Sequence, residues 1–227
     1  MPKVIFKFDI EKDLFNIWET CNSKFIFGYN FKEGISQRII NLCKRKKFEN
    51  IKNTLKNYQK KIYSSKLIPQ IEKSFNEAWN KVEEEYFKRL EKIMKKPFFC
   101  EKITAYLTLV KRCPYNYEKE NPLFFVHLFA GIPNALATAG HEIMHIQFHN
   151  TYWKQTEKKI GKEKTADLKE ALTVLLNLEF QDLWIVPDKG YSIHKELRNF
   201  IEKQWEKEKD FEVLLDNCVD YFMSIKK

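Results

Sequence analysis

The run ALATAGHEIMHIQFH, residues 135–149, is the stretch that most constrains the expected fold. Its first half is rich in alanine and ends at Gly140, which favours a helix that approaches its neighbours closely. In its second half, apolar residues separate polar ones at helical spacing. Residues four apart share one face of an α-helix and lie about 6 Å apart along its axis. His141 and His145 can therefore present two imidazole nitrogens to one cation.

Glu142 completes the pattern. It is rotated from His141 by about 100° around the helix, so its carboxylate points beside the cation and not at it. There it can accept a proton from a water molecule at the metal. HExxH on a helix is typical of zinc sites in peptidases. The apolar flanks indicate a buried helix, in which two unpaired histidines would be costly. The sequence therefore predicts a Zn²⁺ site at His141 and His145.

A zinc site of this kind needs a third protein ligand and an open fourth position for water. The favoured candidate is Glu170, near the start of a helix expected over residues 165–177 and capped by Thr165. Because the rest of this helix is apolar nearly all round, Glu170 is expected to be buried. A buried carboxylate needs a partner charge or a metal. Three other carboxylates remain alternatives: Glu163, Asp167 and, as the strongest of them, Glu179.

Two further histidines are weaker candidates for the third ligand. His149 continues the motif helix but lies about 12 Å along its axis from His141, too far for one ion to reach both. We expect it to support a ligand, pack against a neighbour or face solvent. His127 lies on an expected strand before the helix, where a structural role is the favoured interpretation.

The segment after the second helix offers two candidate groups that could stabilise negative charge on a reacting carbonyl. Residues 187–190 predict a turn, and Ser192 can cap a helix that runs to about residue 207. Tyr191 or His194 could then reach the metal site, with His194 slightly favoured. The alternative is that Tyr191 packs at the start of the helix and His194 lies in solvent.

The whole chain predicts an α+β fold, mainly helical with a small, mostly antiparallel sheet. Strands are expected at residues 3–8, 24–31, 102–110 and 123–129, with the last two forming a hairpin and 123–129 at the edge. Helices are expected at residues 32–63, interrupted near residue 49, at 69–96 as one long helix, and at the C-terminus with a buried stripe of Phe211, Leu214, Leu215, Cys218 and Phe222. We expect a mainly helical region 1–98 with one or two strands and a motif-bearing region 99–227, joined in one compact unit.

The five cysteines are odd in number, widely spaced and without a CxxC pair, which argues against a disulfide framework and a cysteine zinc knuckle. We expect reduced thiols in a cytoplasmic protein. The N-terminus lacks the apolar core of a signal peptide. The longest apolar stretch is far shorter than the roughly 20 residues that cross a bilayer. No membrane partner is therefore expected.

The net charge of +9 is concentrated in the first 100 residues, which hold 22 Lys+Arg and 12 Asp+Glu. Within residues 44–66 there are nine basic residues and one acid. Such a segment could bind nucleic acid. However, 35 of the 40 basic residues are lysine, and proteins that recognise bases favour arginine. A solvated helix is the favoured interpretation of this segment.

With HExxH followed by a glutamate-bearing helix, residues 100–200 resemble the gluzincin group of zincin metallopeptidases. The resemblance implies a zincin-like catalytic region in residues 99–227, His141, His145 and Glu170 as zinc ligands, and Glu142 as general base. The 24 residues between His145 and Glu170 exceed the spacing in the best-known members. The run HEIMHIQFH is also similar to the HExxHxxxH helix of ImmA/IrrE-type regulator proteases, which cleave transcriptional repressors.

These residues predict a zinc-dependent hydrolase of peptide bonds with a peptide or protein substrate. A metal-activated water would attack the peptide carbonyl while Glu142 accepts its proton. The strand expected at 123–129 would hold the substrate in extended form by β-addition. Two alternatives remain: a nucleic-acid-binding or regulatory protein with a zincin-like fold, and a catalytically silent metal-binding interaction module.

Overall fold

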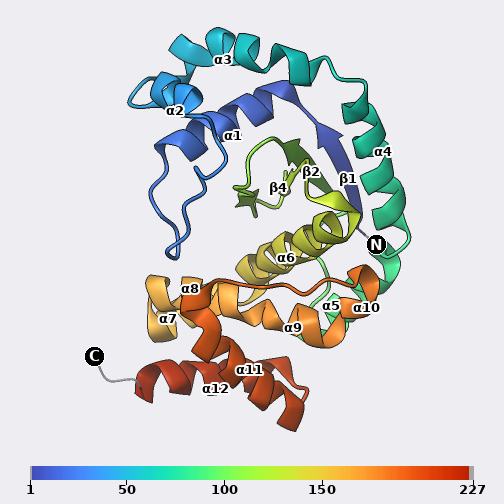
Figure 1. Ribbon diagram of the computed structural model, residues 1–227. Coiled ribbons are helices and arrows are strands. Elements are labelled where there is room, and N and C mark those ends of the chain that lie inside the picture. The colour runs from blue at the N-terminus through green and yellow to red at the C-terminus, as the bar shows by residue number, and fades with distance from the viewer. Residues whose placement is uncertain (1, 225–227) are drawn as a thin grey trace.

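The computed structural model describes residues 2–224 and confirms an α+β fold, with many helices around one small sheet (Figure 1). The strands are β1 (Lys3–Phe8), β2 (Lys102–Thr108), β3 (Tyr115–Asn116) and β4 (Leu123–His127), in the order β1-β2-β4-β3. β1 and β2 are parallel, as are β2 and β4, while β3 is antiparallel to β4. The expectation of a mostly antiparallel sheet is therefore wrong.

The segment between β2 and β4 explains why these strands do not form a hairpin. Residues 109–122 leave the end of β2 and return past β4, forming β3 on the way, so β4 runs in the same direction as β2. Because β4 lies between β2 and β3, it is not the edge strand expected from the sequence. Phe124, Phe125 and Val126 are all buried, as is typical of a strand in a parallel sheet.

Helices α4 (Leu67–Asn80) and α5 (Glu83–Met94) protect the outer edge of β1. Their side-chain oxygens accept backbone N–H groups of this strand: Val4 donates to Glu83 at 2.7 Å, Phe6 to Asn76 at 3.0 Å and Phe8 to Glu72 at 2.8 Å. These bonds satisfy donors that an edge strand would otherwise leave free. The single helix expected at 69–96 is interrupted at residues 81–82, where Glu83 turns inward to β1 and Trp79.

Helices α1 (Ile10–Asn22), α2 (Gln37–Cys43) and α3 (Phe48–Tyr63) surround a second, smaller core. The break between α2 and α3 confirms the interruption expected near residue 49. The strand expected at 24–31 is wrong. Residues 23–36 instead form a loop in which Ile26 and Tyr29 make one isolated bridge. Between them, Phe27 and Gly28 have φ of 49° and 79°, which a strand does not allow.

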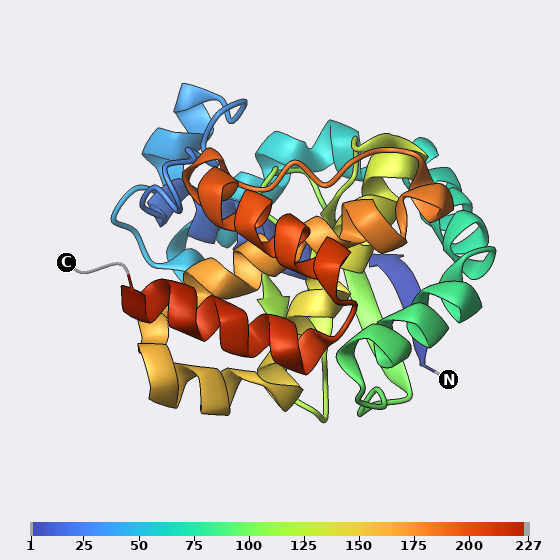
Figure 2. The same ribbon diagram turned by 90° about the horizontal axis from the view of Figure 1, so that it is seen from below.

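Helix α6 (Gly131–Thr151) carries the HExxH run and packs against the sheet and α4. It is followed by α7 (Trp153–Ile160), α8 (Lys162–Leu172), α9 (Val174–Glu179), α10 (Gln181–Trp184), the 3₁₀ turn η1 (Ser192–His194), α11 (Lys195–Lys207) and α12 (Phe211–Ser224). α11 and α12 lie side by side, and α11 packs against α8 (Figure 2). The buried stripe expected on the last helix is confirmed. The larger core contains residues from both expected regions, 1–98 and 99–227, and extends from Val4 to Phe222.

Two expected caps are wrong. Thr165 lies inside α8, which begins three residues earlier, and its hydroxyl donates to the carbonyl of Gly161 at 2.8 Å. Ser192 makes no side-chain cap, because the chain enters α11 through the 3₁₀ turn. Within residues 2–224, no helix combines the length and apolar character needed to cross a bilayer.

Candidate metal centre

Two helices bring the predicted ligands together. α6 presents His141 and His145 one turn apart, and α8 presents Glu170 opposite them. Their candidate ligand atoms all lie within 4.8 Å of one another. Oε2 of Glu170 is 3.2 Å from Nε2 of His145 and 3.5 Å from Nε2 of His141. The convergence that the sequence predicted for these three side chains is present in the fold.

The distances from Glu170 to the two histidines are close to those at a tetrahedral zinc ion. With ligand bonds of about 2.0–2.1 Å, such an ion keeps its ligand atoms about 3.3–3.4 Å apart. The two measured distances lie close to this value. The 3.2 Å contact of His145 is also within hydrogen-bond distance, whereas the 3.5 Å contact of His141 exceeds the usual N–H···O range. The donor set of two imidazoles and one carboxylate is also one that zinc accepts.

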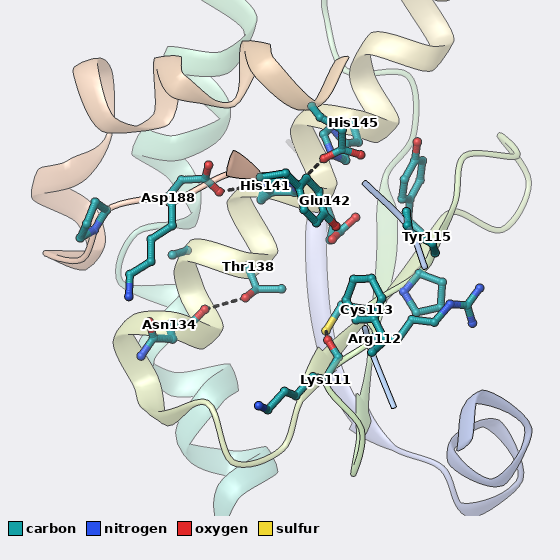
Figure 3. A pocket seen from close by; sticks show the side chains of 18 residues that line it. Lys111, Arg112, Cys113, Tyr115, Asn134, Thr138, His141, Glu142, His145 and Asp188 are labelled. Atoms are coloured by element: carbon teal, nitrogen blue, oxygen red, sulfur yellow. Dashed lines mark hydrogen bonds and ion pairs between the residues drawn. The ribbon is translucent and has the colours of Figure 1, made fainter. Parts of the chain in front are cut away.

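Asp188 orients the first histidine. The Nδ1–H group of His141 donates to Oδ2 of Asp188 at 2.6 Å, which leaves Nε2 directed at the ligand cluster (Figure 3). Asp188 is held in turn by Thr173 and Arg198, whose side chains lie 2.9 Å and 3.0 Å from its Oδ1. The side chain of Asn177 makes two hydrogen bonds to the backbone of Asp188: it accepts from the N–H and donates to the carbonyl. A carboxylate behind a ligand histidine fixes its tautomer and raises its basicity.

The electrostatics of the two histidines differ. Burial favours the neutral form of His141, but the carboxylate of Asp188 outweighs it and raises the pKa well above the usual value. A metal ion would therefore compete with a proton there. Burial, assisted by the positive charge of Lys169, lowers the pKa of His145 to about 3, so this ring is neutral near pH 7. Its buried Nδ1 has no hydrogen-bond partner within residues 2–224.

Glu142 lies on α6 beside the cluster and lines the adjacent cavity. Its side chain is almost fully buried, and burial raises the pKa of its carboxyl to about 7. The positive charges of His141 and Lys169 oppose this shift without cancelling it. Glu142 can therefore both accept and release a proton near neutral pH.

A cavity of about 530 Å³ opens over these residues. α6 forms one wall and residues 111–115 form the opposite wall, while Glu170 of α8, residues 187–191 and the 23–36 loop contribute the remainder. In Figure 3, Asp188 approaches His141 from one side, while Cys113 and Tyr115 lie across the cavity. The cavity therefore gives an external molecule access to the ligand cluster.

Tyr191 and His194, the two candidates for stabilising negative charge on a reacting carbonyl, occupy different places. Tyr191 lines the cavity, and burial raises the pKa of its hydroxyl. His194 does not belong to the cavity wall. Its Nε2 lies 3.0 Å from Oδ1 of Asp167, and its ring packs edge-on against Phe27 at 4.7 Å. The geometry thus favours Tyr191, although the sequence slightly favoured His194, which is buried and not in solvent.

The alternative ligands lie elsewhere. Asp167 pairs with His194, Glu163 is exposed, and Glu179 accepts hydrogen bonds from Trp205 and Lys209. His149 is packed against neighbours: its ring stacks on Tyr117 and Trp153, each at 4.1 Å, and its Nε2 lies 2.8 Å from the hydroxyl of Tyr115. His127, at the end of β4, lies outside the ligand cluster.

Sequence reasoning missed Asp188 and Lys169, both of which contact ligand residues. Asp188 stood in a predicted turn, and its place after a proline and before Lys-Gly suggested only turn chemistry. Lys169 stands next to the favoured glutamate in the sequence, and no role was assigned to it. A signal was present in each case, because an acid and a lysine next to expected ligand segments can act as partners to them.

No protein-family model matches this chain, and the comparisons with curated proteins and with solved structures find no match either. Support for a function therefore comes from the residues of the chain and their geometry. The likeness to gluzincins stays a prediction.

Proposed function

We propose that this protein is a zinc-dependent peptidase of the gluzincin type. The supporting observation is the convergence of three donors, with ligand atoms within 4.8 Å of one another, next to a buried glutamate and open to a cavity. A structural zinc site has four protein ligands, whereas catalytic sites have three and leave one position for water. Within residues 2–224, the cluster contains three ligands, His141, His145 and Glu170.

Zinc held by these residues would supply Lewis acidity, which activates water and polarises a carbonyl group. Glu142, which lines the cavity beside the ligand cluster, accepts the proton of the attacking water and delivers it to the departing amine. Asp188 keeps His141 in the tautomer that offers Nε2. The hydroxyl of Tyr191 is the favoured donor to the negative charge that develops on the carbonyl oxygen, since it lines the cavity.

The substrate is proposed to be an extended peptide or a segment of a protein. β4 is paired with β2 along one edge and with β3 along the other, so it is not the strand to which a peptide would add. Residues 111–115 instead border the cavity opposite α6. A peptide lying along them would place its backbone between this wall and Glu142.

The first test is the metal content of protein purified without chelator, followed by assays on denatured casein and on a mixture of fluorescence-quenched peptides. We expect one zinc per chain and hydrolysis that a chelator abolishes. His145→Ala should lose the zinc and the activity. Glu142→Gln should keep the zinc and lose the activity, because it removes only the proton acceptor. Protein that binds no zinc would overturn the proposal.

Matched controls separate these roles from general damage to the helices. Glu163→Gln makes the same chemical change as Glu170→Gln, on the same helix but at an exposed position. We expect Glu170→Gln to lose zinc and Glu163→Gln to keep both zinc and activity. Full activity in Glu142→Gln would remove this residue from the mechanism while leaving the zinc site in place.

We also propose a cytoplasmic location, supported by the free thiols of all five cysteines. Fractionation of cells that produce the tagged protein would test it. Binding of nucleic acid by residues 44–66 stays a prediction. Helix α3, which makes up most of this segment, buries Ile51 and Leu55 and leaves most of its lysines exposed. A steep dependence of DNA or RNA affinity on salt would support it.

A further inference from the structure

Helix α8 contains a buried lysine next to the candidate ligand Glu170. The Lys169 side chain is only 7% exposed, and its Nζ lies 2.6 Å from Oε1 of Glu170. Lysine is almost never buried unless it is paired, because the ammonium group is costly to remove from water. The pair is therefore a specific arrangement and not an incidental surface contact.

The two oxygens of the Glu170 carboxylate have different partners. Oε1 accepts from Lys169, while Oε2 faces Nε2 of His145 at 3.2 Å and Nε2 of His141 at 3.5 Å. Because Oε1 accepts a hydrogen bond from the ammonium group of Lys169 at 2.6 Å, it is directed away from a cation held by the two histidines. One oxygen of Glu170 is thus assigned to the lysine and the other to the ligand cluster.

The lysine is itself held in place from a second side. Its Nζ lies 4.8 Å from the centre of the Tyr115 ring, within the range of a cation–π contact. The hydroxyl of Tyr115 lies 2.8 Å from Nε2 of His149, whose ring is stacked between Tyr117 and Trp153. Lys169 does not belong to the wall of the cavity, so it acts on Glu170 from behind and does not touch substrate.

We propose that Lys169 is a positioning residue that makes Glu170 a one-oxygen ligand of the metal, and this inference rests on the proposed zinc site. A carboxylate that bound through both oxygens would occupy two coordination positions. With Oε1 held by Lys169, only Oε2 reaches the metal, and the fourth position of a tetrahedral site stays open to the cavity for water. The ammonium group also offsets the charge of the glutamate in a buried setting.

Cobalt substitution tests this role without any measurement of activity. Four-coordinate Co²⁺ absorbs visible light much more strongly than five-coordinate Co²⁺. The wild-type protein should therefore give the strong spectrum of a four-coordinate site. Lys169→Met, which keeps an unbranched side chain one atom shorter but removes the charge, should give the weaker spectrum of a five-coordinate site. Its zinc affinity should fall about 10–100-fold, as for other residues that orient ligands.

Two further variants sharpen the comparison. Lys169→Arg keeps a cation beside Oε1 and should restore the four-coordinate spectrum, which a loss of packing alone does not predict. Lys162→Met makes the same change as Lys169→Met at an exposed position of the same helix and should match the wild type. A Lys169→Met protein with the spectrum and zinc affinity of the wild type would overturn the inference but leave the zinc site intact. A wild-type protein that binds neither metal overturns both.

The crystal structure of the zinc-loaded wild type provides a test that needs no variant to fold. We expect Oε2 of Glu170 on the metal and Oε1 within hydrogen-bond distance of the ammonium group of Lys169. Both carboxylate oxygens on the metal, with Lys169 displaced, would overturn the inference.

Discussion

The buried carboxyl of Glu142 should make the stability of the metal-free protein depend on pH. Burial raises its folded-state pKa to about 7 from the usual value of 4.5. Between these values the folded protein binds more protons than the unfolded chain, so stability falls as pH rises. At 1.36 kcal/mol per unit, the contribution of Glu142 amounts to about 3 kcal/mol. Urea unfolding in the presence of chelator, at several pH values from 4.5 to 7.5, measures it.

Glu142→Gln is the control for this prediction, because it cannot titrate. The free energy of unfolding of the wild type, minus that of the variant, should decrease by about 3 kcal/mol across the window. If the difference in the free energy of unfolding between the wild type and Glu142→Gln stays constant over the whole pH range, the carboxyl of Glu142 has an ordinary pKa in the folded protein.

Asp188 should matter for zinc affinity. It accepts the Nδ1–H of His141 at 2.6 Å and thereby fixes the tautomer that offers Nε2. Replacing such a partner of a ligand typically weakens metal binding by about 10–100-fold. We expect a loss of this size in Asp188→Asn, measured by competition with a chromophoric chelator. Asp182→Asn, in which the exposed partner of Arg89 is changed, should bind zinc as the wild type does.

At the scale of residues, the sequence predicted the groups whose spacing is local. His141, Glu142 and His145 are defined by one helical turn, and Glu170 followed from the cost of burying a carboxylate. Asp188 was not predictable in the same way. It meets His141 across 47 positions of the chain, and that contact exists only after the turn before α11 has packed against α6.

At the scale of elements, Gly140 shows why α6 needs a small residue immediately before the motif. A Cβ atom there would lie 2.6 Å from Cη2 of Trp184 and 3.3 Å from Cε2 of Tyr86, both in buried aromatic rings. Overpacking of this kind typically costs about 1–3 kcal/mol. It should exceed the gain of about 1 kcal/mol that alanine offers in a helix. Gly140→Ala should therefore be less stable than the wild type in urea unfolding.

Thr138→Ala is the matched control, since it introduces alanine two residues earlier in the same helix, at a half-buried position that lines the cavity. It should be close to neutral in stability. A Gly140→Ala protein as stable as this control would mean that Trp184 moves aside at no cost.

The strand assignments show which features of an element a local pattern can predict. Alternation of apolar and polar residues identified β1 and β2, and β4 is an apolar run of the kind found in parallel sheets. Direction was wrong because alternation is the same in parallel and antiparallel pairs, and the turn residues between β2 and β4 favoured a hairpin. The break before α5 was missed because it depends on the contact of Glu83 with β1.

At the scale of the whole molecule, the cavity is bordered by parts of two separate cores. The smaller core of α1–α3 supports the 23–36 loop, and Phe27 at its tip packs against Tyr191 at 5.1 Å. The larger core supports α6 and α8. The sequence predicted a strand at this loop because its aromatic residues alternate with polar ones. The partners of Phe27, Tyr191 and His194, lie some 165 residues away in the chain, where no local pattern can indicate them.

Because the three candidate ligands come from two helices of the larger core, zinc should stabilise the entire fold. Free metal at 1,000 times its Kd adds about 4.1 kcal/mol to the stability of a protein that binds it only when folded. For a domain of this size each kcal/mol raises Tm by about 2–4 °C, which gives a total rise of roughly 8–16 °C. Differential scanning calorimetry of metal-free protein, with and without added zinc, measures the shift. His145→Ala should show almost none of it, because two remaining ligands cannot join α6 to α8 with the same affinity. An equal shift in the wild type and in His145→Ala would place the bound zinc somewhere other than this cluster, and the three donors would then owe their spacing to hydrogen bonding alone.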